Sequence, residues 1–419
     1  MMTLNQPRAD PLNDATPSAA STPTIFIVAG EHSGDALGAK LMAALSSRLG
    51  GQVRFLGVGG HLMESQGLAS LFPLADIAVM GVTAVIGRLP TLVRRIQQTA
   101  AAAIAAAPDV VVIVDAPGFT HQVAKRIRNR CPDIAIVNYV SPTIWAWRPW
   151  RARKMKPYVD HVLALLPFEP QAHAELGGPP CTYVGHPLLE RLPWLAALDP
   201  EPFRAALGLS ADRPIVLVLP GSRRSEVERL MGDFGAAVAL IAACQPGLQV
   251  VIPVMPNVRA LVDVKLAAWP ASVAKPLIVA GDDEVAKFSA FKLARAALAA
   301  SGTVTLELSL TQTPMVVAYK VDAVISTLRH LIKAKTSVLP NLITGQQAIP
   351  EFHQEACTPQ NLAGALDGAM REGPERAAQL AELAQVPSLL ALPSGTASEA
   401  AAAIVMGYLA HGRNSGVKT

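Results

Sequence analysis

Short apolar runs alternate with helical patterns along the first half of the chain. The first run covers residues 25–28 and ends at Gly30, a polar turn covers residues 31–35, and a helical pattern begins at Ala36. Short apolar runs bounded by turn residues predict buried strands, and apolar residues at helical spacing predict amphipathic helices. On this basis we expect helices at 91–107 and 121–130, and further strands at 53–58, 110–114, 134–140, 159–166 and 181–184.

The same alternation starts again in the second half. Residues 187–212 are rich in proline and irregular, which predicts a junction between domains. Beyond the junction we expect helices from about Glu226 and over 304–310, and strands at 215–219, 249–252, 277–279, 296–299 and 315–318. Strands that alternate with helices predict parallel sheets covered by helices. The pattern therefore predicts an α/β protein with two successive halves, each containing a parallel sheet.

The length of the chain agrees with this division, because 419 residues exceed what one ordinary core accommodates. We predict a disordered tail over residues 1–23, a first domain over 24–190 and a second domain over 191–395. A C-terminal helix within 396–419 is expected to pack back on the first domain or on a second subunit. A cleft between two such domains is the default position for a ligand site.

Composition narrows the class of protein. Charged residues make up 16% of the chain and apolar residues 51%, whereas about 25% charged residues is usual for a soluble domain. The net charge of +4 is too small to indicate nucleic-acid binding by itself. The four cysteines are widely spaced and form no C-x-x-C pair, which predicts a reducing compartment and no zinc site. The tail lacks the apolar run of a signal peptide.

Residues 234–258 carry no formal charge, and this stretch is longer than the roughly 20 residues that span a bilayer. Gln245, Pro246 and Gly247 interrupt it, and two more prolines follow at 253 and 256. An alanine-rich helix, a turn and a short strand explain the stretch better than a transmembrane helix.

The turn after the first strand contains several side chains that can bind a ligand or exchange a proton. It places Glu31, His32, Ser33 and Asp35 within five residues, directly after a buried strand. Ligands of doubly wound α/β domains bind at the carboxyl ends of the strands. The glycines at 30, 34 and 38 fit neither the dinucleotide-binding nor the P-loop pattern. The turn therefore predicts a binding site that is not obviously a phosphate cradle.

Asp115 follows the β-branched run 110–114, which is typical of a central parallel strand. Its carboxylate, ionised at neutral pH, could accept a proton at the end of that strand. Equally, it could bond the backbone of the turn formed by Pro117 and Gly118. Position alone does not separate these two interpretations.

Two turns in the second half predict anion binding. Ser301, Gly302 and Thr303 follow an apolar strand and precede a helix, where they could cap the helix or offer N–H donors to phosphate. Glu307 lies one turn into that helix, where it could reach ribose hydroxyls or remain an exposed helix residue. Arg223 belongs to a second strand-to-helix turn, and arginine pairs well with phosphate oxygens.

Two further segments combine apolar and basic residues. Residues 139–156 contain three of the five tryptophans and several basic residues, which suits nucleic-acid stacking, a membrane interface or ordinary core packing. Residues 77–87 form an uncharged run of 11 that is followed by Arg88, Arg94 and Arg95. The run is too short to span a bilayer, and it suits either a buried helix or a helix lying in a membrane surface.

These segments, in this order, resemble the lipid-A-disaccharide synthases. The resemblance covers about residues 24–410 and rests on motifs specific to that family. The matching segments are AGEHSGDALGA (29–39), AVMGVTAVIGRL (78–89), DAPGF (115–119), YVSPTIWAWR (139–148), LLPFEP (165–170), YVGHPL (183–188), LPGSRRSEV (219–227), ASGTVTLEL (300–308), MVVAYK (315–320) and LPNLI (339–343).

The resemblance implies a glycosyltransferase with two Rossmann-like domains, the GT-B architecture, and an interdomain cleft. It implies an inverting reaction that joins UDP-2,3-diacylglucosamine to 2,3-diacylglucosamine 1-phosphate, giving a β-1,6-linked disaccharide 1-phosphate and UDP. It also implies a cytoplasmic location, peripheral on the inner face of the inner membrane of a Gram-negative bacterium. No cofactor, no metal and no nucleic acid are expected, and a homodimer is one possible assembly.

The matching motifs also imply roles for individual residues. Asp115 corresponds to the proposed general base. The implied donor-site residues are Arg223, Ser301, Gly302, Thr303 and Glu307, together with Asn341 and Gln354. The implied acceptor-side residues are Glu31, Ser33, Gly34, Asp35 and Ser141. The implied membrane or acyl-chain contacts are Val79, Met80, Val82 and Arg88.

The chain departs from the family pattern at the motif that carries the base. The family usually has DAPDFN where this chain has Gly118 and Thr120 in place of the second acid and the amide. His32 is likewise a local variant, and we assign it no catalytic role. Two alternatives to a lipid A enzyme remain: another UDP-sugar enzyme of the same architecture, such as an epimerase or a transferase with a soluble acceptor, and a nucleotide-sugar binder without catalysis.

Overall fold

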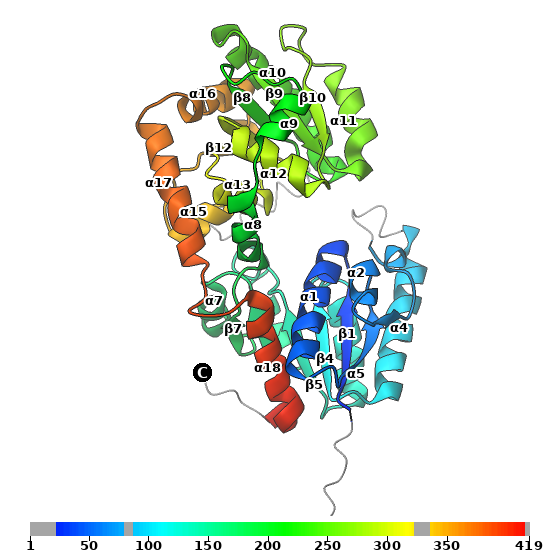
Figure 1. The fold of residues 1–419 in the computed structure, drawn as a ribbon. Coiled ribbons are helices and arrows are strands. Elements are labelled where there is room, and N and C mark those ends of the chain that lie inside the picture. The colour runs from blue at the N-terminus through cyan, green and yellow to red at the C-terminus, as the bar shows by residue number, and fades with distance from the viewer. Residues whose placement is uncertain (1–21, 79–86, 322–335, 415–419) are drawn as a thin grey trace, which may run out of the picture.

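Two parallel sheets, each covered by helices, form the body of the protein in the computed structural model (Figure 1). The structure describes residues 22–78, 87–321 and 336–414. Figure 1 shows one sheet above the other. The chain passes between them twice, once through α8 (Leu192–Ala197) and once between α17 (Pro374–Leu389) and α18 (Ala397–His411).

The first sheet has seven parallel strands in the order β3-β2-β1-β4-β5-β6-β7. Its main flanking helices are α1 (His32–Arg48), α4 (Leu89–Ala106), α5 (Thr120–Arg130) and α7 (Glu169–Glu175), with the short α2 (His61–Glu64) and α6 (Arg151–Met155). The strands are β1 (Thr24–Ala29), β2 (Arg54–Val58), β3 (Ala69–Ser70), β4 (Val110–Val114), β5 (Ala135–Tyr139), β6 (His161–Ala164) and β7 (Cys181–Tyr183).

The second sheet has six parallel strands in the order β10-β9-β8-β11-β12-β13. Its strands are β8 (Ile215–Leu219), β9 (Gln249–Val254), β10 (Leu277–Ala280), β11 (Ala296–Ala300), β12 (Met315–Tyr319) and β13 (Glu351–His353). Its helices are α9 (Glu201–Ala206), α10 (Arg224–Cys244), α11 (Arg259–Leu266), α12 (Glu284–Leu293), α13 (Val304–Leu310), α15 (Leu339–Thr344) and α16 (Pro359–Met370), with α17.

The apolar pattern located the central strands well, since β4 and β8 have the predicted bounds. Both strands are fully buried, so every position must be apolar and the pattern is unambiguous. The pattern missed β3 and β13, which are two and three residues long and are not buried. A strand that short, at the edge of a sheet, has no apolar face to reveal it.

Two expectations about local structure were wrong. The helix after β1 begins at His32, four residues before the predicted start at Ala36, because the polar residues of the turn form its first turn. Residues 187–212 are not irregular, since they contain α8 and α9. Prolines stand in the first turn of both helices, where their missing N–H would have no helical partner in any case.

The uncharged stretch 234–258 forms the end of α10, a turn and β9, as the sequence predicted. Its apolar residues face the core of the second domain, among them Phe234, Val238 and Ile252, all fully buried. Among the helices in the described parts of the chain, none is long and apolar enough to cross a bilayer.

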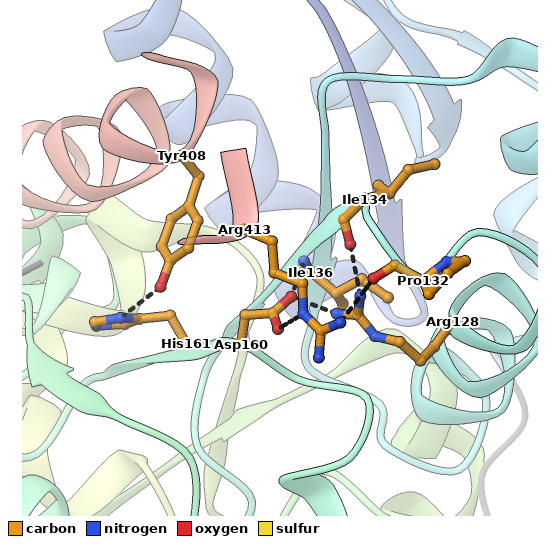
Figure 2. Close-up of polar contacts among 8 residues, drawn as sticks. All are labelled: Arg128, Pro132, Ile134, Ile136, Asp160, His161, Tyr408 and Arg413. Atoms are coloured by element: carbon orange, nitrogen blue, oxygen red, sulfur yellow. Dashed lines mark hydrogen bonds and ion pairs between the residues drawn. The ribbon is translucent and has the colours of Figure 1, made fainter. Parts of the chain in front are cut away.

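The C-terminal helix α18 returns to the first sheet and lies beside α1 (Figure 1). Ala401, Val405 and Tyr408 are buried in the same apolar cluster as Ile25 of β1. Figure 2 shows the polar contacts at the end of this helix: the Tyr408 hydroxyl bonds His161 Nδ1 at 3.2 Å, and Arg413 Nε donates to Asp160 Oδ1 at 2.9 Å. The end of the described chain is therefore anchored to β6 and its preceding turn.

Strand order fixes where a ligand is expected. In the first sheet the order reverses between β1 and β4, and in the second between β8 and β11. Helices on opposite faces diverge at such points, so the carboxyl ends of these strands are the usual ligand sites of open α/β sheets. Four turns are selected in this way: those after β1, β4, β8 and β11.

Candidate active site

Glu31 and Asp115 follow neighbouring strands at the switch point of the first sheet. Ala29 of β1 pairs with Val114 of β4, so Glu31, two residues after Ala29, and Asp115, one residue after Val114, lie at the same edge of the sheet. Burial and the nearby charge of Asp115 raise the pKa of Glu31, while Arg223 and His32 oppose that rise. Because Arg223 belongs to the second domain, charges from both domains act on this carboxylate.

The turn that carries Asp115 is held in an unfavourable backbone conformation. Asp115 and Ala116 have φ angles of +50° and +44°, in the left-handed region that favours glycine. A residue there costs about 1–3 kcal/mol and persists only where its surroundings enforce it. The Thr120 hydroxyl enforces it by donating to the Asp115 carbonyl oxygen at 2.6 Å, and the Asp115 N–H donates to Tyr139 O at 3.0 Å.

The opposite side of this turn rests on Gly30. A Cβ atom at Gly30 would stand 2.3 Å from the Cβ of Ala116, so no larger residue fits. The opening glycine of the first turn therefore serves the Asp115 turn by contact. Gly118, in contrast, is exposed, and a Cβ atom there would meet no atom within 4 Å.

Asp115 itself is left available for chemistry. Its side chain is half-buried, and no hydrogen bond to its carboxylate occurs within the described ranges. Of the two interpretations that the sequence left open, the one in which this carboxylate bonds the Pro117–Gly118 turn is not observed. The turn is held by Thr120 instead.

Asp35 does not line the acceptor side, contrary to expectation. It is only 4% exposed, and its carboxylate accepts from the N–H groups of Gly60, Leu62 and Met63 at 2.8–3.1 Å. These are donors at the start of α2, which otherwise lack partners, so Asp35 stabilises a helix end.

Two smaller acceptor-side residues also lie differently from expectation. A Cβ atom at Gly34 would lie 3.3 Å from Val114 O, so this glycine lets α1 approach the end of β4 and is not the predicted point of sugar approach. Ser141 is 5% exposed, and its hydroxyl contacts His173 Nε2 at 3.0 Å. Ser33 is exposed in the first turn of α1.

The turn after β8 presents Arg223 at the start of α10. Gly221 has a φ angle of +103°, and a Cβ atom there would lie 2.2 Å from Glu226 Oε2. That Glu226 oxygen accepts from the N–H groups of Ser222 and Arg223, both at 3.1 Å, and so fixes the turn. The Arg223 side chain remains 60% exposed and carries one long contact of 3.3 Å to Glu226 Oε1.

The turn after β11 presents backbone donors. Ser301 N donates to Ala318 O at 3.0 Å and the Ser301 hydroxyl donates to Ser337 O at 2.9 Å, so this residue anchors the turn. Gly302 and Thr303 are exposed, and Thr303 makes no side-chain cap to α13. The Thr303 hydroxyl therefore does not cap α13, although the sequence allowed that role.

Glu307 lies one turn into α13 and is not an exposed helix residue. Its Oε1 accepts from Lys287 Nζ of α12 at 2.9 Å, and the two side chains are 20% and 16% exposed. The ion pair orients the carboxylate and leaves Oε2 for a hydroxyl ligand.

The amides of Asn341 and Gln354 are engaged by the backbone, and their place in the donor site stays a prediction. Asn341 is 2% exposed, donates to Ile349 O at 2.9 Å and accepts from Ile349 N at 3.3 Å. Gln354 Oε1 accepts from Val321 N at 2.7 Å. Both side chains fix the path of the chain near β12 and β13.

The predicted membrane contacts lie at the edge of the described chain. Val79, Met80 and Val82 fall outside the described residues. Arg88 is exposed next to α4 and donates to Ala75 O at 3.2 Å.

Sequence reasoning missed three residues that shape this site. Thr120 was noted only as a departure from the family pattern, and Lys287 was not noted at all. Glu169 was also missed, because it lies at the start of α7, five residues after the end of β6, and its partner Trp145 is distant in the sequence. Within the described ranges, no group of three or more histidine, cysteine or acidic residues has the arrangement of a metal site.

Comparisons with known proteins agree with the sequence motifs. The family model described as lipid-A-disaccharide synthetase matches residues 25–405. The lipid-A-disaccharide synthase of Rhodopseudomonas palustris (strain HaA2) is 49% identical over 386 residues, covering 92% of this chain and 96% of that protein. The synthase of Nitrobacter winogradskyi is 49% identical over 390 residues, covering 93% and 96%.

Solved structures confirm the predicted architecture of two Rossmann-like domains. UDP-GlcNAc 2-epimerase from Neisseria meningitidis superposes with a TM-score of 0.63 at 12% identity, covering 92% of this chain and 99% of that one. MurG from Acinetobacter baumannii superposes with a TM-score of 0.53 at 14% identity, covering 92% and 99%. At such identities the likeness establishes the fold alone. The match over nearly the whole chain, at close to half identity, is what shows that this chain belongs to the lipid-A-disaccharide synthase family.

Proposed function

We propose that this glycosyltransferase moves the 2,3-diacylglucosamine unit of its UDP derivative onto the 6-hydroxyl of 2,3-diacylglucosamine 1-phosphate. The products are UDP and a β-1,6-linked disaccharide 1-phosphate. The family supplies the reaction class, which is the formation of the lipid A disaccharide by glycosyl transfer. The observation that carries the assignment of the site is that the charges of Asp115, from the same domain, and of Arg223, from the other domain, both act on Glu31.

Asp115 acts as the general base in this proposal. The acceptor O6 attacks the anomeric carbon of the donor while its proton passes to the Asp115 carboxylate, and the bond from that carbon to the UDP oxygen breaks. A single displacement inverts the anomeric centre. The unbonded carboxylate and the rigid turn support this role, because a general base must be free and already placed near the proton it removes.

Arg223 and the turn at Gly302 and Thr303 take the diphosphate of the donor. The guanidinium provides two parallel donors for phosphate oxygens, and exposed backbone N–H groups add further donors where charge develops on the leaving group. Glu307, oriented by Lys287, accepts from the ribose hydroxyls with its second oxygen. Glu31 stands beside Asp115 and binds acceptor hydroxyls.

The start of α4 provides a surface for a membrane in this proposal. Leu89 and Val93 are 53% and 39% exposed and lie one helical turn apart, and the exposed Arg88 and Arg94 lie beside them. Apolar side chains flanked by arginines suit the boundary between acyl chains and anionic headgroups. Both proposed substrates carry acyl chains and therefore reside in a membrane. A peripheral position on the inner face of the inner membrane would place the site next to these substrates.

Release of UDP from the acylated donor in the presence of the acylated acceptor, in mixed micelles, is the direct test. Disaccharide formation that requires the acylated acceptor would support the proposal. Turnover with a deacylated, water-soluble acceptor at the same rate would point to a different transferase, and conversion of the donor alone would point to an epimerase. A protein that binds UDP but releases none from the donor when both substrates are present would be a nucleotide-sugar binder without catalysis.

Flotation with vesicles that contain anionic phospholipid tests the membrane surface. Replacement of Leu89 and Val93 by serine should reduce the bound fraction several-fold without changing the affinity for UDP. Val264→Ser is the matched control, because Val264 is 69% exposed on α11 of the second domain. Equal flotation of all three proteins would remove the start of α4 from the proposal.

A further inference from the structure

A buried polar cluster joins α7 to the loop that follows β5. Its members are Glu169 and His173 of α7, which are 3% and 0% exposed, and Ser141 and Trp145 of the loop. The Trp145 indole N–H donates to Glu169 Oε1 at 3.3 Å, and the Ser141 hydroxyl contacts His173 Nε2 at 3.0 Å. Trp145 also packs edge-on against Phe168, with ring centroids 5.2 Å apart.

The direction of hydrogen bonding in the cluster follows from one unpartnered atom. His173 Nδ1 is buried and finds no hydrogen-bond partner, and a Cβ atom at Gly178 would lie 2.5 Å from it. An unpartnered acceptor is less costly to bury than an unpartnered N–H, so the proton is on Nε2. Nε2–H therefore donates to Ser141 Oγ, and the Ser141 hydroxyl donates onward to Pro142 O at 3.0 Å.

Glu169 is surrounded by donors. In addition to Trp145, the N–H groups of Leu165 and Leu166 donate to Oε2 at 3.2 and 3.0 Å. Donors on every side suit the ionised carboxylate, whereas burial favours the neutral acid, and burial raises the pKa of Glu169 to about 7. The strength of the bond to Trp145 therefore depends on the charge of Glu169, since a bond to a charged group is the stronger one.

The loop held by this cluster begins beside Asp115. Tyr139, the last residue of β5, accepts from the Asp115 N–H at 3.0 Å. The next residue, Val140, has a φ angle of +78°, which is exceptional for a β-branched side chain. The loop thus leaves the sheet through a strained residue adjacent to Asp115, and the contacts of Ser141 and Trp145 with α7 fix its direction.

We propose that Glu169 and His173 are positioning residues for glycosyl transfer, which hold the loop 141–148 against the acceptor side of the site through Trp145 and Ser141. This proposal rests on the assignment of the acceptor side to the first domain. Neither residue is asked to touch a substrate. We call the contacts of Glu169 with Trp145 and of His173 with Ser141 the clamp. Loss of the clamp should weaken acceptor binding and leave UDP binding unchanged.

Glu169→Gln tests the clamp with little risk to folding. The amide oxygen still accepts from Leu165 and Leu166, but the amide NH₂ meets the Trp145 N–H donor to donor. We expect the KM for the acceptor to rise about tenfold with a smaller change in kcat, because one bond to a charged group is lost. Trp145→Phe removes the same bond from the other side and keeps the ring against Phe168, so it should raise that KM to a similar extent.

The double variant and two matched controls make the result specific. If Glu169 acts through Trp145, the effects of the two changes will not add, and the double variant will resemble either single one. Glu175→Gln makes the same acid-to-amide change on the exposed face of α7, and Trp150→Phe makes the same ring change outside the loop 141–148, at a tryptophan that is 47% exposed, so both should leave the KM unchanged. Additive effects, or an unchanged KM in both single variants, would overturn the proposal.

A second readout does not depend on turnover. In protein labelled with 5-fluorotryptophan, the Trp145 fluorine resonance, assigned with Trp145→Phe, should shift with a midpoint near pH 7 and lose this shift in Glu169→Gln. Other groups facing Glu169 do not titrate there, because burial lowers the pKa of His173 to about 4, raises that of Tyr183 to about 12 and raises that of Cys181 further.

This spectroscopic test separates the clamp from the proposed function. If the wild-type protein formed no disaccharide, the proposed function would fail, while the fluorine resonance would still show whether Glu169 holds the loop. A Trp145 resonance that does not respond between pH 6 and 8 would overturn the clamp, even in a protein with full transferase activity.

Discussion

The turn after β4 and the turn after β8 solve the same backbone problem with different residues. Each turn follows a fully buried strand and contains a residue with a positive φ angle. In the first turn this is the residue directly after β4, and in the second it is Gly221, two residues after β8. The second domain uses Gly221, which adopts such a φ angle at little cost, whereas the first domain uses Asp115 and Ala116, which do not. A strained residue with a side chain is worth keeping only where that side chain is needed.

The surroundings of the two turns differ in the same sense. Thr120, which holds the Asp115 turn, is buried and hydrogen-bonded, and so are Ser141 of the neighbouring loop and His173 of α7. At the second turn Arg223 is mostly exposed, with a single long contact to Glu226. The first side of the site is therefore held in place before substrate binds, while the second side offers an exposed arginine and exposed backbone N–H groups to an anion.

Replacement of the strained residue itself should have the largest effect. Asp115→Asn keeps the shape of the side chain but cannot accept the proton, so kcat should fall about 10²–10⁴-fold with unchanged UDP affinity. Asp109→Asn is the matched control at the other end of β4, where Asp109 accepts from Thr24 N at 2.7 Å. Near-normal turnover in Asp115→Asn would remove Asp115 from the mechanism.

Mild acid should destabilise the first domain before the second. Burial lowers the pKa values of His121, His161 and His173 to about 4, so the unfolded chain binds protons that the folded domain does not. Stability is therefore lost as the pH falls from 6.5 towards 4, by about 2 kcal/mol per histidine at pH 5. The raised pKa of Glu169 has the opposite sign and offsets roughly one histidine, because the folded form takes up a proton between pH 7 and 4.5.

The second domain has a different window. Hydrogen bonds from Ser337 and His353 outweigh burial and lower the pKa of Glu351 to about 2, so its contribution is present above pH 4.5 and is lost only between pH 4.5 and 2. Protection factors from hydrogen exchange measured by mass spectrometry, corrected for the slower intrinsic exchange at pH 5, should be lower at pH 5 than at pH 7 in β1 and β4 and unchanged in β8 and β11. An equal fall of the protection factors in both sheets would contradict this difference.

At the turn after β8, Arg223→Ala should weaken the binding of UDP. Loss of a charge-assisted contact costs about 1.5–3 kcal/mol, so the Kd for UDP should rise about ten- to hundredfold, measured by calorimetry. Arg224→Ala is the matched control, because Arg224 is the next residue, is 76% exposed and pairs with Glu228. If both variants bound UDP equally, the diphosphate would not lie at this turn.

The smallest effect is expected from the hydroxyl that holds the strained turn. Thr120→Val keeps the shape and removes the bond to the Asp115 carbonyl, worth about 1 kcal/mol, so kcat should fall about fivefold. Thr120→Ser should restore it. Thr99→Val is the control, because Thr99 is buried in α4 and its hydroxyl donates to Arg95 O at 2.8 Å, away from the site. A fivefold loss in both valine variants would indicate a general loss of stability.

The amino-acid sequence alone was enough to predict the alternation of strands and helices, the residues at the ends of the central strands and the family. Buried parallel strands must be apolar throughout, so β4 and β8 were evident, and with them Asp115 and the turn before Arg223. Position after such a strand is a local property, which a single sequence displays.

Three-dimensional packing, in contrast, was needed to learn which of the neighbouring polar side chains are free to contact a substrate. Asp35 and Asn341 lie in the family's motif-bearing segments, yet their side chains are occupied by backbone groups of other segments. Glu169 and Trp145 stand 24 residues apart and become partners through the packing of α7. Hydrogen bonding depends on distance in space, and a buried polar group takes whatever partner the fold brings to it, which no local pattern specifies.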